Sequence, residues 1–318
     1  MRSFIGIDGG ATKTAVCAAS ADTSLLRYSK ISGAAWRELG TGKVAQNLKD
    51  AVVDLLGDEY SSIAGIAMGL PCHGESAEGD SALERAICGE FEGIPIYFTN
   101  DVEVGWAGSM ALAPGINIVA GTGAIAFGKD SHGKTARSGG WSEFFGDEGS
   151  CYWVGRKVME LFSKQSDGRM PRDELYATVR RELSLKDDFS FIDLIHSEYA
   201  GYRKQVASLQ FLAEKAALAG SVSARALYGE AVRELLLLVT SIRDQLDFSE
   251  KPFSVSYTGG LFRAGELVMP HFSREVEKAG GVLSVPRFGP VEGAVLLAFQ
   301  QFNPDGLAQI QKILTEKK

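Results

Sequence analysis

The first third of the chain alternates short apolar runs with amphipathic segments. An apolar run over 4–8 breaks at Gly9-Gly10, and strand patterns resume over 14–19 and 25–31, which predicts an opening hairpin. Apolar residues recur at helical spacing over 44–56, so a helix is predicted there. Alternation of strands and helices after a hairpin is typical of an α/β sheet. The pattern continues with a strand over 63–68, a helix over 83–91, a strand over 94–99 and a helix over 102–112.

The order of predicted elements partly repeats after Ala113-Pro114-Gly115, the strongest turn signal in the chain. We predict a first domain over 1–113 and a second over 114–299, with a helical insertion over 151–247. The C-terminal segment over 300–318 is free to return to the first domain. The expected strands of the second part are 116–120, 124–128, 134–138, 253–257 and 282–285. The expected helices are 151–163, 172–182, 202–219, 224–245, 265–279, 291–299 and 305–316.

The composition is that of an acidic globular protein. The 318 residues carry 33 basic and 40 acidic side chains, a net charge of −7, which argues against nucleic acid as a partner. The sequence contains no run of about 18 apolar residues, so no membrane span is predicted. The start lacks the apolar core of a signal peptide. The four cysteines and four histidines are scattered, and no cysteines form a C-x-x-C pair. We expect a cytoplasmic enzyme that binds neither nucleic acid nor membrane.

Four turns combine glycine with hydroxyl or acidic side chains, at residues 8–14, 120–123, 139–150 and 258–260. A glycine turn lets consecutive backbone N–H groups point at phosphate oxygens, and threonine hydroxyls add donors. Asp8, at the end of a strand, can hold Mg²⁺ through water because hard cations prefer oxygen ligands. The turns therefore indicate phosphate binding.

The same turns have three other interpretations: a simple hairpin turn, a dinucleotide-binding motif and a P-loop. A Gly-Gly pair between strands is often only a hairpin turn. Residues 121–126 match the G-x-G-x-x-A dinucleotide fingerprint, and 123–130 nearly match a P-loop, but both motifs must open a helix. Because 124–128 has a strand pattern, and because Asp130 stands where the P-loop needs a hydroxyl residue, we reject both.

Taken in order, the turns resemble motifs of the actin/hexokinase/Hsp70 phosphotransferase superfamily. Residues 8–14 (DGGATKT) resemble its first phosphate motif, 121–124 (GTGA) its second, and 258–263 (TGGLFR) its adenosine motif. The segment 139–153 (GGWSEFFGDEGSCYW) is similar to that of N-acetylglucosamine kinases in the BadF/BadG/BcrA/BcrD ATPase family. The resemblance implies an α/β fold of two RNase-H-like (actin-like ATPase) domains, with an interdomain cleft that holds ATP and Mg²⁺ and closes on a sugar.

The resemblance also implies roles for single residues. Asp101 matches the catalytic base, a carboxylate that orients and deprotonates the attacking hydroxyl in phosphoryl transfer. Asp147 matches an acceptor of sugar hydroxyls. The other positions implied on the sugar side are Ala124, Ile125, Gly140, Trp141 and Ser142. The positions implied on the ATP side are Gly9, Gly10, Thr12, Lys13, Gly121, Thr122, Gly123, Gly259, Gly260 and Ala264, with Asp8 for the metal ion.

Structural roles are the alternative for some of these residues. Asp101 is suited to cap the helix over 102–112. The run 147–150 is suited to cap the helix that follows it, with Trp141 and Trp153 in the core. We favour capping for Glu148 and Ser150, and the sugar for Asp147.

Two segments depart from the family pattern. Residues 33–36 (GAAW) lack the asparagine that related kinases tend to carry near position 34, where it contacts the sugar. Gly220-Ser221 stands where relatives often have Gly-Asp, which weakens a nucleotide contact there. The first departure leaves the identity of the sugar open.

The resulting hypothesis is an ATP-dependent kinase that phosphorylates the 6-hydroxyl of an amino sugar, foremost N-acetylglucosamine or glucosamine. A hexose or a muramic acid derivative stays open as substrate, and so does a homodimer. One alternative is the ATP-driven activator of a 2-hydroxyacyl-CoA dehydratase, in which cysteines of two subunits bridge an iron–sulfur cluster. Another is a sugar sensor that binds DNA, for which the chain carries no basic module.

Overall fold

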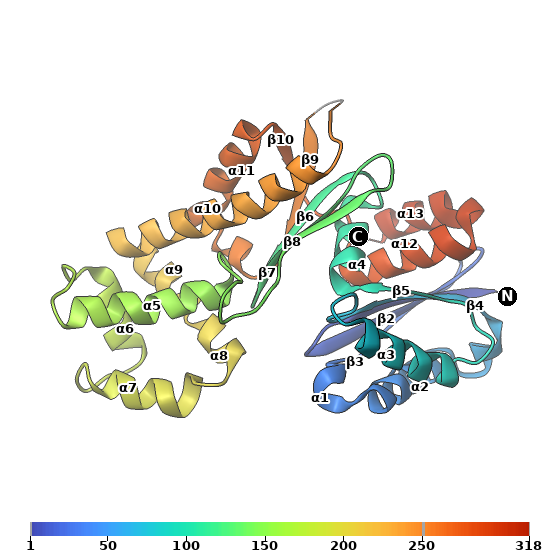
Figure 1. Ribbon diagram of the computed structural model, residues 1–318, viewed down its shortest axis with the longest axis horizontal. Helices are drawn as coiled ribbons and strands as arrows, with labels where there is room; N and C mark the ends of the chain where they lie inside the picture. The colour runs from blue at the N-terminus through green and yellow to red at the C-terminus, as the bar shows by residue number, and fades with distance from the viewer. Residues whose placement is uncertain (1, 250–251, 318) are drawn as a thin grey trace. The chain divides into compact units, whose positions relative to one another are not determined.

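The computed structural model describes residues 2–249 and 252–317, which divide into two compact units. Unit 1 combines residues 2–113 with 285–317, and unit 2 spans Pro114–Ser284. Each unit is built around one five-stranded sheet (Figure 1). Among the helices of the described residues, none has the length and apolar character needed to cross a membrane.

Unit 1 contains a sheet with the strand order β3-β2-β1-β4-β5. β1 pairs antiparallel with β2 and parallel with β4, and β5 pairs parallel with β4. The carboxyl ends of β1, β4 and β5 therefore share one edge of the sheet, and the predicted opening hairpin is confirmed. The strands are β1 (Ser3–Gly9), β2 (Lys13–Ser20), β3 (Leu26–Ser32), β4 (Ile63–Leu70) and β5 (Ile96–Asn100).

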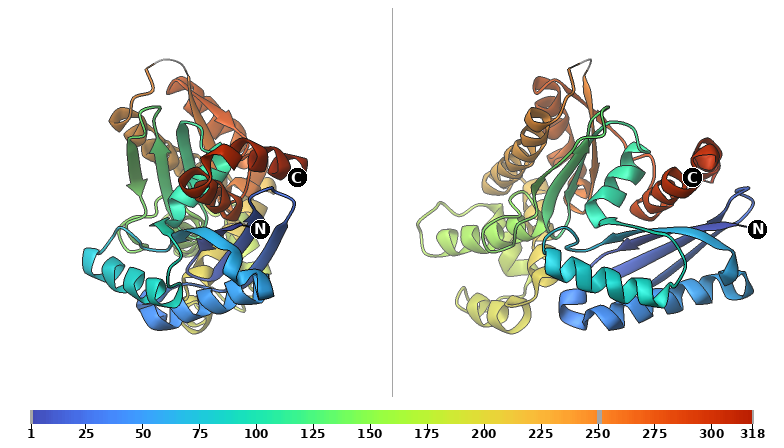
Figure 2. Two further views of the ribbon diagram at one scale, coloured as in Figure 1. Left: turned by 90° about the vertical axis from the view of Figure 1, so that its right-hand side faces the viewer. Right: turned by 45° about the vertical axis from the view of Figure 1, so that its right-hand side comes forward.

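Helices cover both faces of this sheet (Figures 1 and 2). On one face, α2 (Thr41–Leu56) and α3 (Ala77–Glu90) share a hydrophobic core with β1. On the other, α4 (Asp101–Met110) and α12 (Pro290–Phe302) contact β1 and β4. The remaining helices of unit 1 are α1 (Trp36–Leu39), α13 (Leu307–Glu316) and the short 3-10 helices η1 (Gly57–Ser62) and η4 (Pro304–Gly306).

The helix α12 belongs to unit 1, whereas residues up to 299 were expected to belong to the second domain. Residues from 285 onward lie in unit 1, and the rings of Phe4 in β1 and Phe299 in α12 are 4.8 Å apart. Gly6 makes this approach possible, since a Cβ there would lie 2.3 Å from the backbone nitrogen of Val295. Such a long-range contact leaves no periodic signal in the sequence.

Unit 2 repeats the same strand arrangement, with the order β10-β9-β6-β7-β8. Its central strand β6 pairs antiparallel with β7 and parallel with β9, as β1 pairs with β2 and β4 in unit 1. The long helix α10 (Val222–Gln245) contacts β6, β7 and β8. The strands are β6 (Gly115–Ala120), β7 (Ala124–Lys129), β8 (Thr135–Gly139), β9 (Phe253–Thr258) and β10 (Gly281–Ser284).

The helical part of unit 2 contains breaks that the sequence pattern missed. The single helix expected over 202–219 is two helices, which meet at the buried Leu209. The helix expected over 265–279 is interrupted because Gly265 has a positive φ of 52°. The helices of this part are α5 (Cys151–Ser166), α6 (Glu174–Glu182), α7 (Ser190–Leu194), the π-helix η2 (Ile195–Tyr199), α8 (Arg203–Ser208), α9 (Gln210–Leu218), the 3-10 helix η3 (Leu261–Leu267) and α11 (Met269–Lys278).

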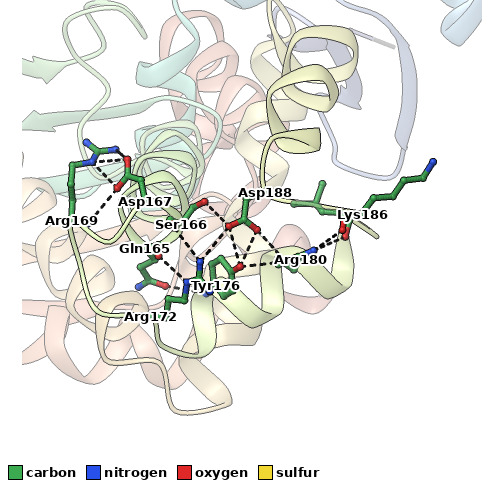
Figure 3. A network of polar contacts seen from close by, with 10 residues as sticks. Gln165, Ser166, Asp167, Arg169, Arg172, Tyr176, Arg180, Lys186 and Asp188 are labelled. Atoms are coloured by element: carbon green, nitrogen blue, oxygen red, sulfur yellow. Dashed lines mark hydrogen bonds and ion pairs between the residues drawn. The ribbon is translucent and has the colours of Figure 1, made fainter.

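A polar network joins α5, α6 and the loop before α7 (Figure 3). Asp188 is its centre: it accepts hydrogen bonds from Ser166 Oγ at 2.6 Å and from Tyr176 Oη at 2.9 and 3.1 Å, and Arg180 Nη1 lies 3.2 Å from its Oδ1. Burial raises the pKa of Asp188, but these hydrogen bonds and the nearby arginines outweigh burial and lower it. The network therefore stabilises the ionised carboxylate and fixes the loop.

Substituting Asp188 by asparagine is expected to lower the free energy of unfolding by about 1–2 kcal/mol at pH 7, because it removes charge-assisted hydrogen bonds. A lowered pKa stabilises the fold above the unfolded pKa of about 3.9, and this stabilisation is lost as the pH falls through the folded pKa. The difference between wild type and D188N should therefore shrink below about pH 4. Urea unfolding of both proteins at pH 7 and pH 3.5 measures this, and an equal difference at both pH values would contradict it.

Candidate functional site

Asp8 and Asp101 lie at the same edge of the unit 1 sheet. Asp8 pairs with Gly69 of β4, and Gly69 pairs with Thr99 of β5, two residues before Asp101. A Cβ at Gly69 would lie 3.2 Å from the Cα of Asp101, so the backbone of α4 begins directly against the end of β4. The two acidic residues predicted for metal binding and for base catalysis are thus brought together by the parallel strands.

Asp101 is not the residue that caps α4. The helix begins at Asp101, and the cap is Asn100, whose Oδ1 accepts a hydrogen bond from the Val102 N–H at 3.1 Å. The Asn100 amide also donates to the His73 carbonyl oxygen at 2.6 Å, which ties the turn to the end of β4. The capping alternative for Asp101 is therefore wrong.

The carboxyl group of Asp8 is influenced by two neighbouring carboxyl groups of unit 1. The pKa of Asp8 is raised to about 7, first by burial and then by the charges of Asp101 and of Glu292 in α12. The sequence analysis missed Glu292, which lies in α12, 284 residues after Asp8. A half-buried carboxyl group whose pKa is raised by desolvation and by neighbouring acids is a frequent mark of a functional site.

The glycine turn that follows Asp8 is held from two sides. Gly10 N–H donates to the Lys13 carbonyl oxygen at 3.0 Å, and the Gly10 carbonyl accepts from Ala34 N–H at 3.0 Å. A Cβ at Gly33 would lie 2.0 Å from the carbonyl oxygen of Ala11. Residues 33–36, which lack the expected asparagine, thus support the turn after Asp8 through their backbone. Of the other predicted residues here, Thr12 and Lys13 are exposed and Gly9 is buried.

In unit 2, the glycine turns predicted for phosphate and adenosine lie side by side. A Cβ at Gly259 would lie 2.4 Å from the Ala120 carbonyl and 2.7 Å from Gly121 nitrogen, and the φ of Gly259 is 111°. Gly121 accepts a hydrogen bond from the Cys151 N–H at 2.8 Å, and Gly260 faces the Cys151 sulfur. Thr122 and Gly123 are half-buried beside them, and Ala264 is buried in η3.

The segment over 139–150 contacts the start of β7. Gly140 N–H donates to the Ala124 carbonyl oxygen at 2.9 Å, and a Cβ at Gly140 would lie 2.5 Å from Ile125 Cδ1. Trp141 is 78% exposed, so the alternative that placed it in the core is wrong, and Ser142 is half-buried. Ser150 caps α5 by accepting from Trp153 N–H at 3.0 Å, as expected.

Asp147 is the buried acidic residue of this segment. Its side chain is 3% exposed, its φ is 59°, and its Oδ1 accepts the Ala124 N–H at 3.0 Å. Its Oδ2 accepts a hydrogen bond from Arg203 Nη2 at the start of α8. Arg203 was missed, because it lies 56 residues further along the chain inside a region read only as helical.

The residues around Asp8 suit a hydrated Mg²⁺. Within 2–249 and 252–317, no three His, Cys, Asp or Glu side chains form a group that could hold a metal ion. Mg²⁺ rarely needs such a group, since one or two carboxylates, water and substrate phosphates are its usual ligands. The crowding of acidic groups that raises the pKa of Asp8 would be relieved by a cation. The donor set therefore fits the ion.

Comparisons with known proteins identify the family and the relatives of this chain. The BadF/BadG/BcrA/BcrD ATPase family matches residues 5–298. The chain is 30% identical over 266 residues to an N-acetylmuramic acid/N-acetylglucosamine kinase of Clostridium acetobutylicum, covering 82% of this chain and 86% of that one. It is 28% identical over 289 residues to an N-acetyl-D-glucosamine kinase of Dictyostelium discoideum, covering 86% and 89%.

The fold also matches a solved structure. A candidate N-acetylglucosamine kinase of Chromobacterium violaceum superposes with a TM-score of 0.72 at 24% identity, covering 94% of this chain and 99% of that one. The fold is α/β with two units of RNase-H-like strand order, as the turn motifs implied.

Proposed function

This chain belongs to the BadF/BadG/BcrA/BcrD ATPase family, and on that premise we propose that it is an ATP-dependent kinase of N-acetylglucosamine or a closely related amino sugar. The relatives from Clostridium acetobutylicum and Dictyostelium discoideum, which are kinases of such sugars, support the substrate class. The reaction transfers the terminal phosphoryl group of ATP to a sugar hydroxyl, for which we propose the 6-hydroxyl, and releases ADP.

The observation that carries this proposal is the arrangement of Asp101 and Asp8 beside a glycine turn at one sheet edge. Phosphoryl transfer needs mainly positioning and stabilisation of charge, because the transition state is loose. Asp101 accepts the proton of the attacking hydroxyl, which makes its oxygen the better nucleophile. Asn100 fixes the start of α4 and so holds the Asp101 backbone.

Asp8 would hold Mg²⁺ through water, and the ion, when bound, neutralises charge on the phosphate oxygens. The turns over 9–13 and 121–123 are the proposed phosphate contacts, because glycine lets the backbone approach a ligand closely. The N–H groups of Gly10 and Gly121 already donate to the carbonyl oxygens of Lys13 and Gly123, so phosphate would be bound by the other donors of the two turns. Gly259, Gly260 and Ala264 are the proposed adenosine contacts. Ala124, Ile125, Gly140, Trp141, Ser142 and Asp147 are the proposed sugar contacts.

No observation favours the electron-transfer ATPase. A shared iron–sulfur cluster needs cysteine thiolates. Burial is the largest influence on the thiols of Cys17 and Cys151, raising the pKa of Cys17 strongly and that of Cys151 to about 11. Burial therefore favours the protonated thiol at both positions over the thiolate that an iron ligand requires.

A panel assay of ADP release tests the proposed reaction. The purified protein, with ATP and Mg²⁺, is expected to release ADP with N-acetylglucosamine, and we include glucosamine, N-acetylmuramic acid and glucose to define the class. N-acetylglucosamine lacking the 6-hydroxyl should compete with the substrate without being phosphorylated. Absence of sugar-dependent ADP release across the panel would reject the kinase, and phosphorylation of the 6-deoxy sugar would reject the 6-hydroxyl.

A further inference from the structure

Arg203 connects two acidic residues of the segment over 139–150. It is the first residue of α8, and its side chain is 42% exposed. Its Nη2 donates to Asp147 Oδ2, and its Nε lies 3.7 Å from Glu143 Oε2. One guanidinium therefore spans two carboxylates four residues apart, a geometry that suits the planar fork of arginine better than the point charge of lysine.

The same guanidinium also lies against the glycine turn over 121–123. A Cβ at Gly123 would lie 2.8 Å from Arg203 Nη2 and 2.9 Å from Asp147 Oδ1. Next to this turn, Asp147 Oδ1 accepts the Ala124 N–H. The turn, the segment over 139–150 and α8 thus meet at one buried carboxylate.

Arg203 fixes the position of the Asp147 carboxylate. Both oxygens of Asp147 have a partner, one a backbone N–H and the other Arg203, and its side chain is nearly fully buried. A buried carboxylate that loses its charged partner is costly and tends to rearrange. Removing Arg203 would therefore shift Asp147 and, through the Ala124 contact, the segment and the turn.

We propose that Arg203 is a positioning residue for the sugar: through Asp147 it holds the segment over 139–150 against the turn over 121–123. This inference rests on the proposed kinase function, since it assigns Arg203 to the sugar side of that reaction. The role is indirect, because Arg203 acts on Asp147 and needs no contact with the sugar itself.

The first test requires no ligand. Hydrogen exchange in the free wild type, R203M and R203K is followed at the Ala124 amide and over 139–150. We expect Ala124 exchange to be at least about 10-fold faster in R203M, because the acceptor Asp147 is no longer fixed, and intermediate in R203K. The control R169M removes an exposed arginine that pairs with Asp167 in the same unit and should leave this exchange unchanged.

The second test measures kinetics with the preferred sugar of the wild type. R203M should raise KM for the sugar at least about 10-fold while KM for ATP changes less than about 2-fold, with partial rescue in R203K. R169M should match the wild type.

The outcomes separate the two proposals. If wild type phosphorylates no sugar, the kinase proposal fails, and the exchange data alone decide whether Arg203 holds the segment. If wild type is active, an unchanged sugar KM in R203M, or activity lost only in proportion to the unfolded fraction, overturns the inference about Arg203. Unchanged exchange at Ala124 also overturns it.

Discussion

Replacing Asp101 by asparagine is expected to lower kcat for sugar phosphorylation by about 10²–10⁴-fold, the usual contribution of a positioned general base. Asparagine has nearly the same shape but cannot accept the proton of the attacking hydroxyl. ATP binding should be retained, because loss of the Asp101 charge lowers the raised pKa of Asp8 and so favours the ionised form that is proposed to hold Mg²⁺. Steady-state kinetics and calorimetric titration with ATP measure the two quantities.

The effect of D101N on the free energy of unfolding is expected to be small, and it can be measured separately from the effect on kcat. Asp101 is an acidic residue in the first turn of α4, where a negative charge favours the helix by about 0.3–1 kcal/mol. Glu78 has the same kind of position in α3, away from the carboxyl cluster, so E78Q is the matched control. D101N should lose no more stability than E78Q, because it also relieves the repulsion between Asp101 and Asp8, and only D101N should lose activity. Retention of more than about a tenth of kcat in D101N would remove Asp101 from the role of base.

The sequence predicted the parts of the site that depend on local patterns. Asp8 and the glycine turns follow strands whose apolar runs are short and clear, and β1, β6 and β9 lie where those runs predict. Parallel pairing of β1, β4 and β5 then brings Asp8 and Asp101 to one edge. The strands follow from periodicity, whereas the roles of Asp8 and Asp101 were implied by the resemblance of the turns to a known family.

The remaining features depend on contacts between distant residues. Glu292 reaches the carboxyl cluster because α12 contacts β1 and α4. Arg203 reaches Asp147 because α8, which begins at Arg203, contacts α5, the helix that follows the segment over 139–150. Neither residue stands in a recognisable motif. The cap of α4 is a further case: Asp101 was only an alternative cap, and because Asn100 and Asp101 are both favourable caps, the sequence alone does not distinguish them.

Gly108 in α4 and Gly293 in α12 lie where these two helices contact each other. Replacing Gly293 is expected to have the second large effect, a loss of stability. A Cβ at Gly293 would lie 2.1 Å from the Val104 carbonyl oxygen and 2.3 Å from the Gly108 nitrogen, while one at Gly108 would lie 2.1 Å from the Gly289 carbonyl oxygen. The obstructing atoms are backbone, so no side chain can rotate away. The two helices must separate to accept even alanine.

Substituting Gly293 by alanine is therefore expected to lower the free energy of unfolding by about 3 kcal/mol, the upper part of the range for overpacked sites. Activity should fall as well, because α4 begins with Asp101 and α12 carries Glu292, and small displacements of reacting groups are costly. Urea denaturation and the ADP assay measure both. G89A is the matched control: Gly89 lies in α3 with no atom within 4 Å of its would-be Cβ, so alanine should stabilise by about 0.5 kcal/mol. If G293A and wild type unfold at the same urea concentration, the close approach of the two helices does not position these carboxylates.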